Sequence, residues 1–216
     1  MCNSYGLGGY LHDGEEPRSP LRPLDQRESE RAIAEWAQGR GGRAAITGSK
    51  ARNLNPIIRA GSDDRELVFA WWWLWLDSSG PAKFSAFNAR DDKLMRSWKK
   101  PFQTRALLPA DWYVEKKGRF TLPQGEQFGI AAITSTVTTD DGDLITYSMV
   151  TRDAPAGSEA AEYWPRMPLV LPRDMHDEWL DPERPGDASL VAEVQHASEE
   201  ISRELITTAP ETPALF

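Results

Sequence analysis

The stretch ELVFAWWWLWL at residues 66–76 constrains the fold more than any other part of the sequence. It ends in ten consecutive apolar residues, and successive side chains of a strand point to opposite faces of a sheet. Both faces of this segment are therefore apolar, which is typical of a strand buried on both sides. The alternation predicts Trp71, Trp73 and Trp75 on one face and Trp72 on the other.

Around this strand the sequence predicts several shorter strands and three helices. The expected strands lie at residues 44–48, 105–115, 119–123, 128–137, 144–151 and 167–172, separated by turns. The expected helices lie at residues 24–38, 174–180 and 189–205. In the first helix Asp25 is the candidate N-cap, and the GRGG sequence at 39–42 ends the helix. The sum is a single α+β domain with a curved, barrel-like, mostly antiparallel sheet flanked by helices.

Composition restricts the class of protein further. Apolar residues make up 40% and charged residues 27%, as in soluble globular proteins. We expect no membrane span and no signal peptide, and a single cysteine fits a reducing cytoplasm. One cysteine and three scattered histidines (His12, His176 and His196) provide no zinc spacing, so we expect no metal and no cofactor.

The net charge of −8 hides an uneven distribution along the chain. Residues 40–120 contain sixteen Lys and Arg against eight Asp and Glu, a net charge of +8, so the remainder carries −16. A basic middle segment between acidic flanks can present a local phosphate-binding surface, and the flanks limit nonspecific adhesion. An ordinary solvated surface is the alternative that charge alone leaves open.

The only cysteine, Cys2, directly follows Met1. Initiator methionine is commonly removed before a small residue, so we expect a mature chain that starts with cysteine. Its α-amine, with a pKa of about 7.7–8.0, could condense with an aldehyde to an imine. The thiol on the adjacent carbon could then close a five-membered thiazolidine ring intramolecularly. An ordinary thiol nucleophile and a residue without a role are the alternatives, and position alone favours the last.

Four motifs follow Cys2 in a fixed order. They read NAR at 88–90, SWKKPFQTR at 97–105, PADWYVE at 109–115 and RMPLVL at 166–171. Together with the initial Met-Cys, these motifs resemble those of the SRAP family, the SOS response-associated peptidases or abasic-site-processing proteins. The resemblance covers residues 2–182, which we expect to form an SRAP-like domain, followed at 183–216 by a C-terminal helix and a loosely held tail.

The resemblance implies a monomer that binds abasic sites in single-stranded DNA, whose ring-opened sugar exposes an aldehyde. Cys2 would form a thiazolidine crosslink with that aldehyde, and Asn88 would position the reacting sugar. Glu115 would act as acid and base for imine formation and ring closure. From the residues alone, Asn88 could instead cap a turn and Glu115 could be an ordinary surface charge. The sequence does not indicate which other proteins bind this one.

The resemblance also implies residues that contact DNA. Arg90 and Arg96 would hold phosphates, Thr151 would lie close to the site, and Arg166 would contact DNA or brace its loop. An ion pair between Arg90 and Asp92 is the alternative for the first of these. In the tryptophan-rich strand, we expect most rings in the core, with Trp73 and Trp75 as candidates for stacking on bases.

The sequence departs from the family pattern at three places. Trp164 stands where the family has a histidine two residues before Arg-Met-Pro, and indole cannot exchange protons at neutral pH. Trp112 replaces a glycine and is expected to narrow the pocket. Asn3 and Ser4 replace Gly-Arg, which removes one phosphate-binding arginine. We therefore expect the crosslink to form and its reversal to be slow.

Two other functions compete with DNA crosslinking. One is a cysteine peptidase or autopeptidase, as the family name implies, although Cys2 without a nearby histidine would be poorly activated. The other is a noncovalent DNA-binding relative whose catalysis has decayed, a reading that rests on Trp164. Whether the protein is an enzyme, with lyase or hydrolase activity, stays open at this point.

Overall fold

The computed structural model describes residues 2–7, 21–62, 64–116 and 118–208. Its strands are β1 (Ser4–Gly6), β2 (Arg43–Ala45), β3 (Leu54–Ala60), β4 (Arg65–Trp71), β5 (Trp75–Asp77), β6 (Gly80–Pro81), β7 (Asn88–Arg90), β8 (Arg105–Ala110), β9 (Trp112–Glu115), β10 (Gly118–Thr121), β11 (Phe128–Thr139), β12 (Gly142–Asp153), β13 (Arg166–Pro168), β14 (Val170–Leu171) and β15 (Ile206–Thr208). Its α-helices are α1 (Arg27–Arg40), α2 (Glu159–Tyr163), α3 (His176–Leu180) and α4 (Ala188–Glu204).

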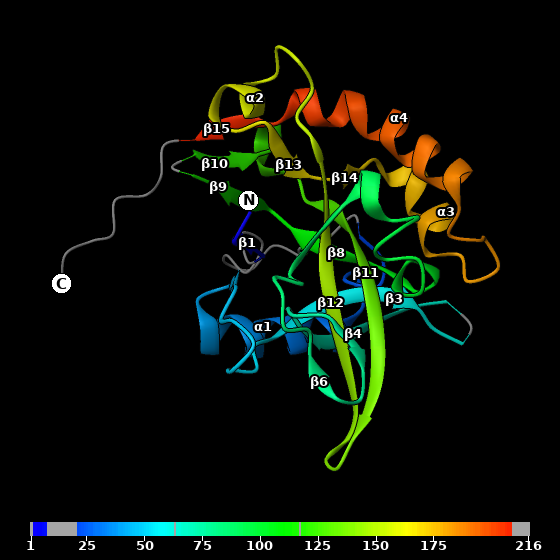
Figure 1. The fold of residues 1–216 in the computed structure, drawn as a ribbon. Helices are drawn as coiled ribbons and strands as arrows, with labels where there is room; N and C mark the ends of the chain where they lie inside the picture. The colour runs from blue at the N-terminus through cyan, green and yellow to red at the C-terminus, as the bar shows by residue number, and fades with distance from the viewer. Residues whose placement is uncertain (1, 8–20, 63, 117, 209–216) are drawn as a thin grey trace.

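Five strands close into a barrel in the order β12, β4, β3, β8, β11 and back to β12 (Figure 1). The long β11–β12 hairpin pairs from Ala132 opposite Met149 to Thr139 opposite Gly142. Only the contact of β12 with β4 is parallel among these pairings. The predicted α+β domain with a curved, mostly antiparallel, barrel-like sheet is confirmed.

Further strands extend the barrel at β12 and β11. β7 pairs with β12 in parallel, β13 pairs with β12 antiparallel, and β14 pairs with β11. The single predicted strand at 167–172 is therefore two short strands that join different partners. Leu169 separates them, because its N–H donates to the carbonyl of Val150 while its own carbonyl accepts from Ala131.

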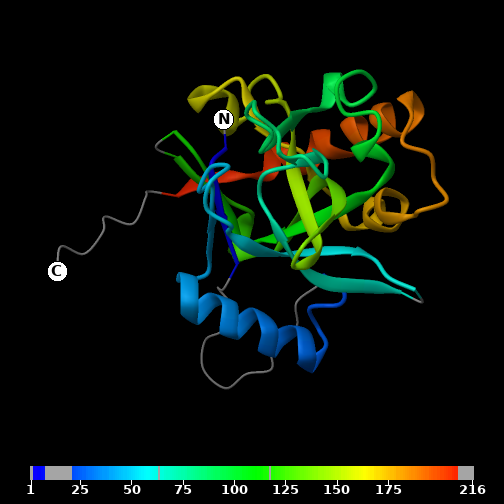
Figure 2. The same cartoon turned by 60° about the horizontal axis from the view of Figure 1, so that its bottom comes forward.

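A second sheet has the order β15, β10, β9, β1, β2 and is antiparallel throughout (Figure 2). It brings the start of the described chain into pairing with the 109–115 motif, since Ser4 lies opposite Val114. Tyr5 connects this sheet to the barrel through a hydrogen bond of 2.8 Å between its hydroxyl and that of Tyr147. Trp72 packs between these two tyrosine rings, with centroid distances of 5.2 and 5.9 Å.

The expected strand at 66–76 is interrupted. β4 ends at Trp71, and a backbone hydrogen bond of 2.8 Å from Trp73 N–H to the Trp71 carbonyl turns the chain before β5 begins at Trp75. The turn sends Trp72 into the main core, while Trp71 packs with the β11–β12 hairpin. Trp75 packs against that second cluster, whereas Trp73 contacts both clusters, so the predicted separation from Trp72 does not hold for Trp73.

The first helix buries its predicted apolar face. Ile33, Trp36 and Ala37 are buried, and Trp36 donates from its indole to the Leu54 carbonyl of β3. The helix ends before Gly41, whose φ of 61° suits a residue without a side chain. The expected N-cap Asp25 is wrong, because α1 starts at Arg27 with Gln26 at the cap and no side-chain capping bond.

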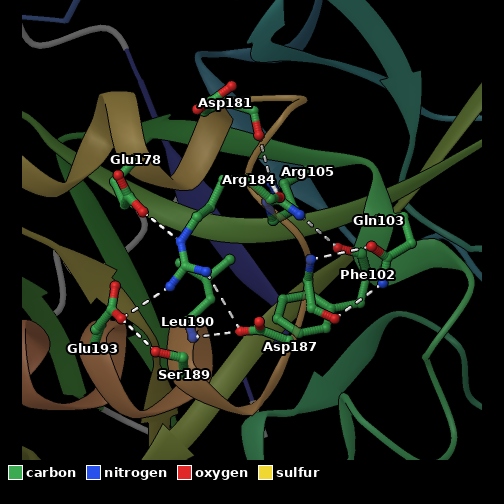
Figure 3. Close-up of polar contacts among 11 residues, drawn as sticks. Phe102, Gln103, Arg105, Glu178, Asp181, Arg184, Asp187, Ser189, Leu190 and Glu193 are labelled. Carbon is green, nitrogen blue, oxygen red and sulfur yellow. Dashed lines mark hydrogen bonds and ion pairs between the residues drawn. The ribbon is translucent and has the colours of Figure 1, made fainter.

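The loop between α3 and α4 is held to β8 by Arg105, the last residue of the 97–105 motif (Figure 3). Its buried guanidinium donates to the carbonyls of Phe102, Trp179, Asp181 and Arg184. Salt bridges from Arg184 then reach the α3 and α4 helices, at Glu178, Asp187 and Glu193. This arginine of the motif therefore stabilises the fold around α4, on the far side of the molecule from α1 (Figures 1 and 2).

After α4, β15 pairs with β10 in the second sheet. The rest of the predicted tail, residues 209–216, lies outside the described residues. Within the described part of the chain, no helix is both long and apolar enough to cross a membrane.

Candidate functional site

Cys2 lies just before β1, at the junction of the second sheet and the barrel. Its side chain is 1% exposed, and its Sγ is 3.4 Å from the Ser4 carbonyl oxygen. Asn88, at the start of β7, donates from Nδ2 to the Cys2 carbonyl at 2.8 Å. Because β7 is fixed against β12, this hydrogen bond holds the Cys2 backbone to the barrel.

Glu115 ends β9, the strand that pairs with β1. Its side chain is 3% exposed, and burial raises the pKa of its carboxyl, an effect partly offset by the positive charge of Lys116. A carboxyl whose pKa is raised toward neutrality can both accept and donate a proton. Asn88 and Glu115, far apart in the sequence, are thus both brought near Cys2.

The thiol of Cys2 is held in its neutral form. Burial, followed by the nearby negative charge of Glu115, raises the pKa of Cys2 to about 12. At neutral pH this thiol is therefore almost entirely protonated, and a free thiolate is scarce. Ionisation of this sulfur therefore requires a base that takes its proton during the reaction.

Three buried tyrosines surround this site. Tyr5 and Tyr147 share their hydrogen bond, whereas the hydroxyl of Tyr113 has no hydrogen-bond partner among the described residues. Burial, then the charges of Cys2 and Glu115, raise the pKa of Tyr113 well above its usual value. Strand alternation places Tyr113 on the same face of β9 as Glu115. Sequence reasoning missed Tyr113, and its place two residues before Glu115 was the available signal.

Arg166 and Thr151 meet where β12 and β13 run side by side. Arg166 Nη2 lies 3.1 Å from both Asp91 Oδ1 and Thr151 Oγ1, and Nη1 lies 2.8 Å from Asp153 Oδ1. The Arg166 side chain is 11% exposed and Thr151 is buried. Arg166 therefore joins β13 to β12 and to the turn after β7.

Arg90 and Arg96 lie at the surface instead. The Arg90 guanidinium makes two hydrogen bonds to Asp92, of 2.8 and 2.9 Å, as the sequence alternative allowed. Exposed ion pairs of this kind contribute about 0–1 kcal/mol, so a phosphate can displace the carboxylate at little cost. Arg96 is exposed and lines a surface hollow together with Lys99 and Lys100.

The two candidate stacking residues, Trp73 and Trp75, are half-buried. Trp73 donates from its indole to the Ala82 carbonyl at 2.9 Å, and the Trp75 ring meets the edge of Trp71 at 5.9 Å. Among the described aromatic residues, Phe84 is the most exposed, at 52%. It lies four residues before Asn88, a distance of at most about 14 Å along the chain. Sequence reasoning missed Phe84, because nothing around it marks an exposed ring.

Trp112 does not narrow the site, contrary to expectation. Its ring covers the backbone of Gly6, at the opposite end of β1 from Cys2, and stacks with Arg119 at 4.5 Å. Alternation along β9 places Trp112 and Glu115 on opposite faces of the strand. Trp112 lines a separate hollow with Gln124 and Gly125.

Trp164, at the position of the family histidine, begins the chain after α2. The ammonium group of Lys116 lies over its ring, with Nζ 3.8 Å from the ring centroid. His176 lies elsewhere, buried against Gly129 with Nε2 3.1 Å from the Leu171 carbonyl oxygen. Neither Trp164 nor His176 can act as the acid–base histidine of the family pattern in this arrangement.

Comparison with known proteins supports the motif-based resemblance. The sequence profile of the SOS response associated peptidase (SRAP) family matches residues 29–209. The chain belongs to the SRAP family. The matched segment includes Asn88, Glu115, Thr151 and Arg166 of the candidate site, and Cys2 lies ahead of it. No curated protein sequence matches the chain significantly.

Solved structures share the SRAP fold of this chain. A protein from Bordetella bronchiseptica has a TM-score of 0.65 at 16% identity, covering 98% of this chain and 100% of that one. A protein from Bacteroides thetaiotaomicron has a TM-score of 0.57 at 21% identity, with coverages of 75% and 76%. A phage-related protein from B. bronchiseptica has a TM-score of 0.53 at 20% identity, with coverages of 79% and 83%. These identities establish a shared fold.

Proposed function

We propose that this SRAP protein captures abasic sites in single-stranded DNA through a thiazolidine at Cys2, after removal of Met1. One observation carries the proposal: Cys2 is held by Asn88 beside Glu115, a buried carboxyl with a raised pKa. This arrangement provides two nucleophiles on one residue and a group able to move protons between them.

The reaction begins at the α-amine, because the thiol is almost entirely protonated at neutral pH. The amine nitrogen attacks the aldehyde carbon of the ring-opened sugar, and a proton passes from nitrogen to the former carbonyl oxygen. Glu115 in its acid form protonates the resulting hydroxyl, which leaves as water and gives an imine that is protonated on nitrogen. Asn88, fixed on β7, keeps the Cys2 backbone in place during this step.

Ring closure follows within the same residue. Glu115, now a carboxylate, accepts the proton of the Cys2 thiol as sulfur attacks the imine carbon. The electron pair of the C=N bond returns to nitrogen, which keeps its one hydrogen and becomes neutral, and the thiazolidine is complete. The net reaction joins protein and DNA with loss of one water and needs no oxidant or metal.

The surface around the site offers contacts for the strand. Arg90 and Arg96 are exposed cations available to phosphates, and Phe84 offers a face for an unstacked base. Trp73 and Trp75 are second candidates for stacking, with half-buried rings. Arg166 hydrogen-bonds both Thr151 and Asp91, and so holds the turn that follows β7 against β12.

A peptidase is less well supported by the same geometry. A cysteine peptidase needs a thiolate activated by a base, and the pKa of Cys2 is raised to about 12. Among the described residues, the buried His176 forms a hydrogen bond with the Leu171 carbonyl and not with Cys2. Trp164 favours a third reading, a noncovalent DNA-binding relative, because it replaces a proton-transferring residue.

The test uses a single-stranded oligonucleotide with one abasic site and a denaturing gel. Wild type should give a heat-stable shifted band, Cys2→Ala none, and Glu115→Gln a band that forms about 10²-fold or more slowly. A wild type without a band, or a Cys2→Ala band of equal intensity, would refute the proposal. Equal, fully salt-reversible binding of intact and abasic strands would favour the noncovalent relative.

A further inference from the structure

Lys116 adopts an unusual backbone conformation directly beside Glu115. Its φ is 56°, in the left-handed region that residues with a side chain rarely occupy. The position lies in the connection between β9 and β10, where Glu115 pairs with Gly118. Glycine or asparagine would adopt this φ more readily, so lysine here points to a role for its side chain.

The side chain of Lys116 lies over the Trp164 ring, and its ammonium group is accessible to a ligand. Nζ lies 3.8 Å from the centroid of the Trp164 ring, within the range of a cation–π interaction. Lys116 is exposed, and no carboxylate among the described residues forms an ion pair with it.

The ring beneath the lysine is itself anchored. Ser158 caps α2, and the backbone N–H of Trp164 donates to the Ala160 carbonyl at 3.1 Å. The preceding Tyr163 meets the edge of Phe120 on β10 at 5.4 Å. The loop carrying Trp164 therefore lies against the same hairpin that positions Lys116 and Glu115.

From this juxtaposition we infer that Lys116, seated on Trp164, binds a phosphate of the DNA strand next to the reacting sugar. The inference rests on the proposed function, because every sugar of a DNA strand is flanked by phosphates and Lys116 directly follows Glu115. Asn3 and Ser4 replace the Gly-Arg of the family pattern, so the family arginine is missing at residue 4, and the Ser4 hydroxyl accepts a hydrogen bond of 3.2 Å from Arg43 instead. Lys116 adds a positive charge from the connection between β9 and β10.

The experiment measures noncovalent binding of single-stranded DNA carrying a tetrahydrofuran abasic analogue, which has no aldehyde. The affinity is followed by fluorescence anisotropy over a range of salt concentrations. Lys116→Met should reduce the slope of log K against log salt by about 0.7, the value for one lost phosphate contact on a single strand. Lys116→Arg should restore the slope. The matched control is Arg31→Met, on α1 away from β9 and β10 in both views, which should leave it unchanged (Figures 1 and 2).

A second variant tests the role of the ring. Trp164→Leu removes the aromatic face and should weaken binding several-fold, because the lysine is no longer held in place. A slope for Lys116→Met equal to wild type, or no measurable binding by wild type, would overturn the inference. Crosslinking is assayed separately with a true abasic site. If wild type fails to crosslink but Lys116→Met still has a smaller salt slope than wild type, the proposed function is refuted and the phosphate contact stands.

Discussion

The Cys2 thiol is 1% exposed, and burial together with the charge of Glu115 raises its pKa to about 12. An ionised nucleophile is therefore unavailable before substrate binds. A substrate that first reacts with an amine and only later with the thiol fits this environment better than one that needs a thiolate. The same carboxyl that suppresses ionisation of Cys2 is positioned to take its proton once an imine has formed.

Tyr113 provides a prediction at this scale. Its buried hydroxyl has no partner among the described residues and lies on the same face of β9 as Glu115. We expect this hydroxyl to donate a hydrogen bond to the reacting oxygen of the sugar. Tyr113→Phe should slow crosslinking about 2- to 10-fold without a change in Tm, as measured in a time course with abasic DNA.

The control for this variant is Tyr163→Phe, which changes an exposed tyrosine packed against the same Phe120 ring. It should leave the crosslinking rate unchanged. Equal rates for Tyr113→Phe and wild type would show that the Tyr113 hydroxyl takes no part in the reaction.

Trp164 gives a second prediction for a single residue. Without a proton-transferring group at this position, the crosslink of the wild type should persist once formed. Trp164→His should speed its reversal by up to about 10²-fold, because imidazole can exchange protons near neutral pH. Release of labelled DNA from the purified crosslink measures this, with Trp164→Phe as the control that keeps a ring without a titratable group. A Trp164→His half-life equal to wild type would contradict it.

The sequence named Cys2, Asn88 and Glu115 from separate motifs, and the fold places Asn88 and Glu115 near Cys2, while their catalytic roles stay predictions. Tyr113 escaped prediction because a tyrosine in a strand is most often an ordinary core residue. Whether its hydroxyl finds a partner depends on strands that only the folded chain brings together.

At the scale of elements, the tryptophan-rich segment shows where local pattern fails. Its apolar residues predicted one long buried strand, and hydrophobicity alone cannot distinguish that from two strands joined by a buried turn. The chain turns after Trp71 so that Trp72 enters the main core and packs between Tyr5 and Tyr147. The sequence of the segment alone does not predict this contact, because Tyr5 and Tyr147 lie far away in the chain. The two helices at 174–180 and 189–205, with strong local patterns, were predicted nearly to their ends.

The packing of β1 on β9 leads to a prediction about an element. A methyl group on Gly6 would lie 2.1 Å from the Trp112 ring, far inside van der Waals contact. Gly6→Ala should therefore lower the free energy of unfolding by about 1–3 kcal/mol, as measured by urea denaturation. The same substitution should cost much less in a Trp112→Ala background, which removes the ring. Equal costs in both backgrounds would show that the ring is not the obstacle.

At the scale of the whole molecule, a closed barrel and an attached sheet meet at the candidate site. The barrel positions Asn88 through β7, and the sheet positions Cys2 and Glu115 through β1 and β9. Many short strands in the sequence indicated a curved sheet, but not which strands close it. The parallel contact of β12 with β4, which completes the ring, joins segments far apart in the chain.

Stability of the whole fold should depend on pH through His176. Burial lowers the pKa of His176 to about 4, whereas in the unfolded chain it lies near 6.5. Between these values the unfolded chain binds a proton that the folded chain does not, so stability falls as pH decreases from 6.5 to 4. The loss from this group reaches about 3 kcal/mol.

Urea denaturation between pH 7 and pH 4 measures this dependence. His176→Gln keeps a donor toward the Leu171 carbonyl and carries no titratable ring, so its stability should fall less steeply over that range. Parallel curves for the two proteins would mean that His176 does not remain neutral in the fold.

The most direct test of the central claim is the intact mass of the product formed with an abasic oligonucleotide. The account predicts a species with the mass of the chain starting at Cys2 plus the DNA, minus one water, and no such species from Cys2→Ala. An adduct that retains Met1, an adduct of equal yield from Cys2→Ala, or no adduct from wild type would contradict it.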